Sequence, residues 1–193
     1  MSPLAVTLVI LVRTYDVFGV PVQDLDTARR AADETLRTAG IEAAWTTCRR
    51  GAVASLSSPR CLEPLASSEI MVRLIGAPDG SHDEATLGCA YVDTGVRRGV
   101  LASLYAARIT ALADRAGVDR GLLLGRALAH EIGHLLLGTS THRPRGLMRA
   151  LWTLEELRRS IEKDWLFSRL DIADIHMRLR DRGVMAELAG SSH

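Results

Sequence analysis

Two histidines four residues apart in an apolar segment constrain this chain more than any other feature. His130 and His134 lie in the string HEIGHLLLG. Its apolar character predicts a helix, so both imidazoles project from one face, about one turn apart. Glu131 points to the adjacent side, where its carboxylate can take a proton from water without binding the metal. The segment therefore predicts a metal site with two nitrogen ligands and a general base.

The residues after this helix supply candidates for the rest of the site. Gly138 is expected to end the helix, because glycine tolerates the left-handed backbone that commonly follows one. The chain can then turn back and bring His142 to the same ion. Three neutral imidazoles leave a fourth position open for water, which distinguishes a catalytic zinc from a structural one. We therefore expect Zn²⁺ as the cofactor.

The whole string from His130 to Met148, HEIGHLLLGTSTHRPRGLM, resembles the metzincin signature, HExxHxxGxxH followed by a methionine turn. The resemblance implies that His130, His134 and His142 bind zinc, that Glu131 is the base, and that Met148 lies beneath the metal. The spacing differs from the signature. Here the glycine follows the second histidine by four residues and the third histidine follows it by eight, instead of three and six. The string is more like that of a group of small bacterial metzincin-like peptidases than that of matrixins or astacins.

The resemblance also implies a fold and an activity. Metzincin domains contain a twisted mixed sheet packed on two long helices, so we expect an α+β domain, α/β-like in its N-terminal half, with a small helical C-terminal part. They are zinc-dependent endopeptidases, so the expected partner is a peptide or protein substrate. An edge strand above their cleft binds the extended peptide by strand addition. The segment 87–93, LGCAYVD, is the candidate for this strand.

Length and charge narrow the possibilities further. A chain of 193 residues has the length of one domain. We divide it into sheet and helices (1–129), the zinc motif (130–148) and a helical tail (149–193). The 24 basic and 23 acidic side chains give a net charge of +1. This balance argues against nucleic acid as the main partner, because phosphate contacts favour a clustered basic excess. We expect a monomer.

The N-terminal segment predicts a parallel β-α-β unit. Residues 4–12, LAVTLVILV, are too short to span a membrane and lack the flanking features of a secretory signal. Because the segment is rich in valine and apolar on both faces, it predicts a buried central strand. A helix should follow, capped by Asp24 or Asp26 and closed by Gly40, and then a strand over 41–48. The expected inward face of that helix is Leu25, Ala28, Ala32, Leu36 and Ala39.

Further elements follow from local patterns. Strands are expected at 69–75 and 100–105 and a helix at 106–116, and Asp119 should cap the zinc helix. Thr153 and Glu156 form a capping box for a helix to about residue 163. A last helix should turn three apolar side chains inward, those of Ile172, Ile175 and Leu179. His176 lies among these positions and is expected to be structural.

The cysteines indicate whether the protein folds in an oxidising or a reducing compartment. Cys48 and Cys61 flank an irregular loop, and a disulfide there would contribute roughly 3 kcal/mol in the chain-entropy model. The alternative is two unpaired thiols in a reducing cytosol. The metzincin resemblance favours the disulfide, because its members commonly carry a cysteine pair here. A secreted or periplasmic location is therefore favoured, with any export signal removed or never present. Cys89 is expected to be a buried free thiol.

Three alternatives remain open at this point. In gluzincins the third ligand is a glutamate beyond HExxH, and Glu155 or Glu156 has suitable spacing, although both fit a helix N-terminus. HEIGHLLLG also fits cytosolic regulatory peptidases of the HExGH type, but their downstream E-A-N-x-F-A helix is missing from this sequence. The third alternative is a non-catalytic domain that keeps the metal for stability. A metal cluster at residues 82–84 is also conceivable, but a solvated loop explains these residues more simply.

Overall fold

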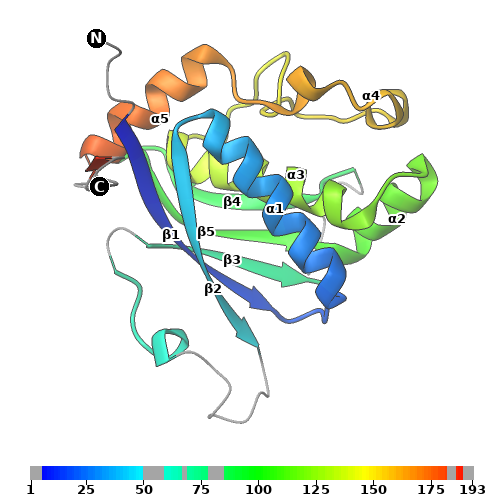
Figure 1. The fold of residues 1–193 in the computed structure, drawn as a ribbon, viewed down its shortest axis with the longest axis horizontal. Coiled ribbons are helices and arrows are strands. Elements are labelled where there is room, and N and C mark those ends of the chain that lie inside the picture. The colour runs from blue at the N-terminus through cyan, green and yellow to red at the C-terminus, as the bar shows by residue number, and fades with distance from the viewer. Residues whose placement is uncertain (1–5, 50–58, 67–68, 78–84, 182–185, 189–193) are drawn as a thin grey trace, which may run out of the picture.

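The computed structural model describes residues 6–49, 59–66, 69–77, 85–181 and 186–188. A mixed sheet forms its centre, with the strand order β2-β1-β3-β5-β4 and with β6 added beside β1 (Figure 1). The strands β1, β2, β3 and β5 are mutually parallel where they pair, whereas β4 is antiparallel to β5 and β6 to β1. The strands are β1 (Val6–Asp16), β2 (Ile41–Arg49), β3 (Glu69–Ile75), β4 (Gly88–Asp93), β5 (Arg98–Tyr105) and β6 (Ala186–Leu188). The helices are α1 (Val22–Thr38), α2 (Ala106–Ala116), α3 (Arg120–Leu137), α4 (Leu154–Arg159) and α5 (Arg169–Asp181).

The predicted β-α-β unit is confirmed, but the predicted helix cap was wrong. β1 pairs with β2 in parallel, from Leu8 opposite Ile41 onward. All five residues of the expected inward face of α1 are buried. The helix begins at Val22 after Pro21, with no side-chain cap, so Asp24 and Asp26 lie inside it. Proline presets the backbone angle of a helix start, which explains why the helix begins before either aspartate.

The helices α1 and α3 cover one face of the sheet (Figure 1). The side chains of Leu8, Ile10 and Val12 on β1 point to that face and are 1% exposed each. Val9 and Leu11 alternate with them and are half-buried. β1 is therefore a central strand, as predicted, but its second face is only half-buried, because α1 and α3 cover the face of Leu8.

The zinc-motif helix α3 packs against α1 with very little space between the two backbones. A Cβ atom on Gly125 would lie 2.5 Å from the carbonyl oxygen of Ala28 and 2.6 Å from the Cβ of Ala31. Gly121, one turn earlier, meets α1 in the same way. A glycine inside a helix costs about 1 kcal/mol relative to alanine. Here it permits the close approach that fixes α3 beside α1 on the same face of the sheet.

The C-terminal part differs from the prediction in two details. The capping box of Thr153 and Glu156 is present, but α4 ends at Arg159 because Ser160 adopts a left-handed backbone with φ of 44°. A short 3₁₀ turn, Glu162–Trp165, replaces the rest of the expected helix. The strand β6 after α5 was not predicted. In α5, Ile175 and Leu179 are buried and Ile172 is partly buried, as expected.

Several smaller predictions have clear outcomes. The ring of His176 bonds to the carbonyl oxygen of Ala39 at 2.6 Å, as expected of a structural histidine. Cys48 at the end of β2 forms a disulfide with Cys61. Cys89 is half-buried rather than buried, because β4 is an edge strand. No helix among the described residues is long and apolar enough to cross a membrane. Residues 82–84 lie outside the described chain.

Candidate metal centre and cleft

The zinc-motif helix begins and ends where the sequence predicts. The Asp119 side chain accepts a hydrogen bond from the backbone N–H of Leu122 at 2.7 Å. At the other end Gly138 is left-handed, with φ of 61°, and its N–H bonds to the carbonyl oxygen of His134. A Cβ atom on Gly138 would lie 2.1 Å from the carbonyl oxygen of Arg97, so neither the backbone angle nor the space admits a side chain. The chain therefore leaves the helix at Gly138, one helical turn after His134.

Three histidine rings converge after this turn. The Nε2 atom of His134 lies 3.1 Å from Nε2 of His130 and 3.3 Å from Nε2 of His142. The candidate ligand atoms of all three lie within 4.8 Å of one another. Two nitrogens at about 2.05 Å from one tetrahedral zinc ion would lie roughly 3.3 Å apart. The distances from His134 to the other two histidines therefore match those of ligands that share a single ion.

The hydrogen bonds of the rings define which nitrogens carry lone pairs. Nδ1 of His130 donates to the carbonyl oxygen of Leu147, and Nδ1 of His134 donates to that of Thr139, both at 2.8 Å. A carbonyl oxygen only accepts, so each Nδ1 carries the proton and each Nε2 a lone pair. Facing lone pairs repel each other unless a cation lies between them. The donor set is therefore suited to Zn²⁺.

Burial keeps these rings neutral. Desolvation lowers the pKa of His130 to about 3, with a further contribution from the neighbouring His134. Desolvation likewise lowers the pKa of His134 to about 4 and lowers that of His142. A neutral imidazole is the form that binds a metal. At pH 7 all three rings are ready to bind.

Glu131 lies beside the rings with its carboxylate buried. The side chain is 6% exposed, and its Oε2 atom has no hydrogen-bond partner among the described residues. Burial raises the pKa of Glu131 to about 8. A cation bound nearby would favour the ionised form. A carboxyl group with one buried oxygen unpaired among the described residues, next to a candidate metal site, is suited to exchange a proton with water or substrate.

Met148 packs against α3 at Gly133. It is 1% exposed, and its Sδ atom would be 2.6 Å from a Cβ atom on Gly133, which lies between the two helical histidines. Its carbonyl oxygen accepts a hydrogen bond from the N–H of Arg143 at 2.8 Å. The turn at Met148 therefore supports both α3 and the start of the loop after His142.

The rival third ligands have other contacts. The carboxylate of Glu156 accepts hydrogen bonds from the backbone N–H and the hydroxyl of Thr153, both at 2.8 Å. Glu155 is exposed and faces Arg159 at 3.8 Å. Neither belongs to the converging group, whereas His142 does.

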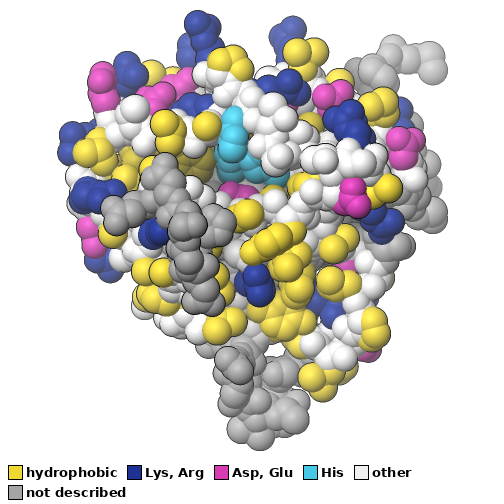
Figure 2. All heavy atoms as spheres, turned by 180° about the vertical axis from the view of Figure 1, so that it is seen from behind, with side chains coloured by type: hydrophobic (Ala, Val, Ile, Leu, Met, Phe, Trp, Pro, Cys, Tyr) yellow, Lys and Arg dark blue, Asp and Glu magenta, His cyan; other side chains and the backbone are white. Residues whose placement is uncertain are grey.

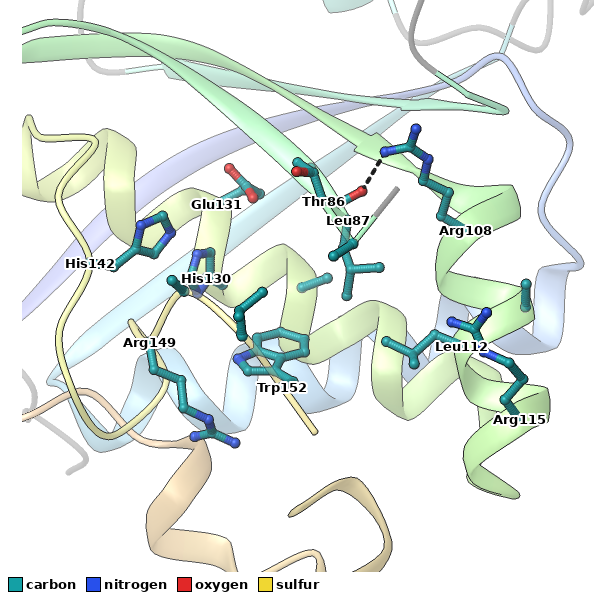
Figure 3. Close-up of a pocket in the computed structure, with 16 residues that line it drawn as sticks. Thr86, Leu87, Arg108, Leu112, Arg115, His130, Glu131, His142, Arg149 and Trp152 are labelled. Carbon is teal, nitrogen blue, oxygen red and sulfur yellow. Dashed lines mark hydrogen bonds between the residues drawn. The ribbon is translucent and has the colours of Figure 1, made fainter. Parts of the chain in front are cut away.

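A cavity of about 550 Å³ opens beside the histidines. Figure 2 shows histidine side chains in a hollow on this face, with acidic atoms next to them. The ring of Trp152 meets that of His130 edge to face at 5.6 Å between centroids. Arg108, Leu112 and Arg115 of α2 line the opposite side (Figure 3). These residues were not predicted from the sequence, although their helical spacing places them on one face of α2.

Comparison with solved structures identifies the architecture. No protein-family model and no curated protein matches the sequence. The crystal structure of archaemetzincin from Methanopyrus kandleri is similar with a TM-score of 0.58 and 17% identity, over 89% of this chain and 96% of that one. The fold is the metzincin fold.

Two further structures share this metzincin fold. A zinc-dependent peptidase from Methanocorpusculum labreanum has a TM-score of 0.55 and 17% identity, over 86% of this chain and 99% of that one. Metalloproteinase-II from Bacteroides fragilis has a TM-score of 0.54 and 15% identity, over 91% of this chain but 55% of that one. The predicted mixed sheet on two helices is thereby confirmed, and the histidine triad lies where the motif resemblance expects it.

Proposed function

We propose that this protein is a zinc-dependent metalloendopeptidase. The observation that carries the proposal is the convergence of His130, His134 and His142 beside the buried carboxylate of Glu131, on a metzincin fold. Two of the structures with this fold are described as a zinc-dependent peptidase and a metalloproteinase, which supports the same chemistry here.

The chain's own residues supply the remaining parts of the reaction. The Nε2 atoms of His130, His134 and His142 would hold the zinc ion, which would supply Lewis-acid activation of water and of the scissile carbonyl. Glu131 takes the proton of the attacking water and passes it to the leaving amine. The carbonyl oxygens of Leu147 and Thr139 keep the two helical imidazoles in the correct tautomer and orientation.

The edge strand β4 is the proposed binding site for the peptide backbone. It ends the sheet and pairs with β5 on one side. A Cβ atom on Gly88, its first residue, would lie 2.7 Å from Oε1 of Glu131. An extended peptide that pairs with the other side of β4 would therefore pass the base.

The proposal also covers the cellular compartment and the oligomeric state of the protein. The disulfide between Cys48 and Cys61 is typical of proteins that fold in an oxidising environment, which favours a secreted or periplasmic enzyme over a cytosolic regulatory peptidase. We expect the enzyme to act as a monomer with a single metallopeptidase domain.

The test is the variant Glu131→Ala, with Glu34→Ala as the control because Glu34 is an exposed glutamate of α1. Loss of the general base should reduce kcat by about 10²- to 10⁴-fold while zinc content, measured by elemental analysis, is unchanged. Glu34→Ala should keep full activity. A fully active Glu131→Ala protein would refute the assigned role, and a zinc-loaded wild type that cleaves no member of a peptide library would indicate a metal-binding domain without activity.

A further inference from the structure

One face of α2 forms the wall of the cavity opposite the histidines. Arg108, Ala111, Leu112 and Arg115 follow one another at helical spacing and all line the cavity. Figure 3 shows Arg108, Leu112 and Arg115 on the side away from His142 and Glu131. A side chain that enters the cavity from the metal site therefore approaches this face of α2.

The charged residues of the lining are mostly basic. Among the described residues, the lining contains three arginines and one carboxylate, that of Glu131. The guanidinium of Arg149 turns away from the cavity and donates to the carbonyl oxygens of Gly146 and Asp164 (Figure 3). The positive charge that faces the cavity therefore comes from α2.

The two arginines of α2 differ in how firmly they are held. Arg108 is half-buried, donates to the carbonyl oxygen of Thr86 at 3.0 Å and stacks over the ring of Tyr105. Its guanidinium is therefore held in place at the cavity wall. Arg115 is exposed at the end of α2. Its charge is more strongly screened by solvent, but its side chain is free of a structural role in the wall.

Apolar side chains also line the cavity: Leu87, Leu112, Ala127, Leu151 and Trp152. Leu87 and Trp152 lie between the histidines and the arginines of α2 (Figure 3). A substrate side chain must therefore present an aliphatic stem to this region and a group that suits the arginines at its end. A carboxylate satisfies the second condition because guanidinium groups bind it with directed, charge-assisted hydrogen bonds.

We propose that this cavity selects peptides with a carboxylate next to the scissile bond. The carboxylate belongs either to a glutamate or aspartate side chain or to the end of the substrate chain. The proposal rests on the peptidase function proposed above and specifies its substrate class. Lysine and arginine at the same position are disfavoured by repulsion from α2, and neutral residues gain only the apolar contacts.

A matched peptide series tests the preference. The peptides are identical except for one position next to the scissile bond, which carries Glu, Gln or Lys; both neighbouring positions are tested in turn. Each peptide is made in two forms, one with a free C-terminal carboxylate and one with a C-terminal amide. We expect kcat/KM for the Glu peptide to exceed that for the Gln peptide by roughly fivefold, because a partly exposed ion pair contributes only a modest binding energy. This ratio should fall as the salt concentration rises. If the free C-terminus raises kcat/KM but Glu in place of Gln does not, the recognised carboxylate is the C-terminus of the substrate chain.

Reversing the charge of Arg115 tests whether the preference comes from the cavity or from the overall electrostatic potential of the protein. Arg115→Glu should remove the preference for Glu over Gln and raise kcat/KM for the Lys peptide. The control is Arg169→Glu, an equal change of charge at an exposed position in the first turn of α5 that does not line the cavity. It should leave the preference for Glu intact. Arg108 is less suitable because its loss would also release Thr86.

Binding provides a second readout that does not depend on turnover. The zinc-loaded Glu131→Ala protein should bind the Glu peptide more tightly than the Gln peptide in calorimetry, and the added Arg115→Glu change should abolish the difference. Equal rates and equal affinities for the Glu, Gln and Lys peptides, with an enzyme that does cleave them, would overturn this inference and leave the peptidase function standing. Cleavage of none of them by the zinc-loaded wild type would instead count against the function itself.

Discussion

Gly88 shows how a residue without a side chain contributes to the position of the base. It is the first residue of β4, and a Cβ atom there would lie 2.7 Å from Oε1 of Glu131 and 2.9 Å from the carbonyl oxygen of Ser103. The carbonyl oxygen belongs to the sheet and has little freedom to move. The carboxylate is the group that would shift.

We predict that Gly88→Ala lowers kcat at least about tenfold with zinc content unchanged, because the methyl group displaces the Glu131 carboxylate and not the imidazoles. Single-turnover kinetics and elemental analysis measure the two effects. Gly95→Ala, in the exposed turn between β4 and β5, is the matched control and should retain activity. Full activity of Gly88→Ala would mean that the base tolerates displacement or lies elsewhere.

His142 decides whether the site has three histidine ligands. Its ring is more exposed than those of His130 and His134, and it comes from the loop rather than from α3. Removal of a direct ligand should reduce metal affinity by more than the 10- to 100-fold typical of residues that only support a ligand. We therefore predict that His142→Ala weakens zinc binding by more than about 100-fold in a competition titration, whereas Glu155→Ala does not change it. Unchanged affinity in His142→Ala would assign the third position to Glu155, Glu156 or water.

Among the elements, the loop after His142 depends on α5. Arg143 donates from Nε to Oδ1 of Asp171 at 2.8 Å, and Asp171 is 1% exposed. The other oxygen of Asp171 accepts from the backbone N–H and the hydroxyl of Ser168 at 3.1 and 2.6 Å. One carboxylate thus fixes the start of α5 and holds the residue next to His142.

We predict that Asp171→Asn weakens zinc binding severalfold and lowers the free energy of unfolding by roughly 1.5–3 kcal/mol, since a buried hydrogen bond to a charged group is lost. Titration with a zinc indicator and urea unfolding measure the two quantities. Asp174→Asn is the control, because the Asp174 side chain is 43% exposed and lies 3.6 Å from the same arginine, and it should have little effect. A variant that loses stability but keeps full zinc affinity would show that Asp171 supports α5 alone.

The element boundaries that the sequence predicted correctly have local causes. Asp119 and Gly138 delimit α3, and the Thr153 side chain starts α4, because each acts on backbone groups within a few residues. The boundary of α4 at Ser160 was missed. The hydroxyl of Ser160 accepts a hydrogen bond from Arg126 of α3, a contact that no local pattern reveals. The strand β6 was missed because it depends on its partner β1.

At the scale of the whole molecule, the metal site lies on a fold that has its own core. The buried residues of β1, β3, α1 and α3 form one hydrophobic cluster that contains none of the three histidines. Zinc should therefore add stability through binding rather than create the fold. A ligand at 100 times its Kd contributes about 2.7 kcal/mol.

We predict that chelation lowers Tm by roughly 5–10 °C without unfolding the protein, as expected from about 2–4 °C per kcal/mol for a domain of this size. Calorimetry with and without chelator, with zinc added back as the control, measures the shift. The His142→Ala protein should show a much smaller shift. Complete unfolding on chelation would mean that the metal serves the fold.

The sequence by itself determined the local chemistry of this protein. The spacing of His130 and His134 on a helix, the helix end at Gly138 and the parallel unit of β1, α1 and β2 all follow from patterns of neighbouring residues. Only the tertiary structure decided that His142 reaches the other two rings, that the Glu131 carboxylate is buried against Gly88, and that α2 lines the cavity with arginines. These features depend on contacts between distant segments, such as that of Arg143 with Asp171, and periodicity along the chain carries no information about them.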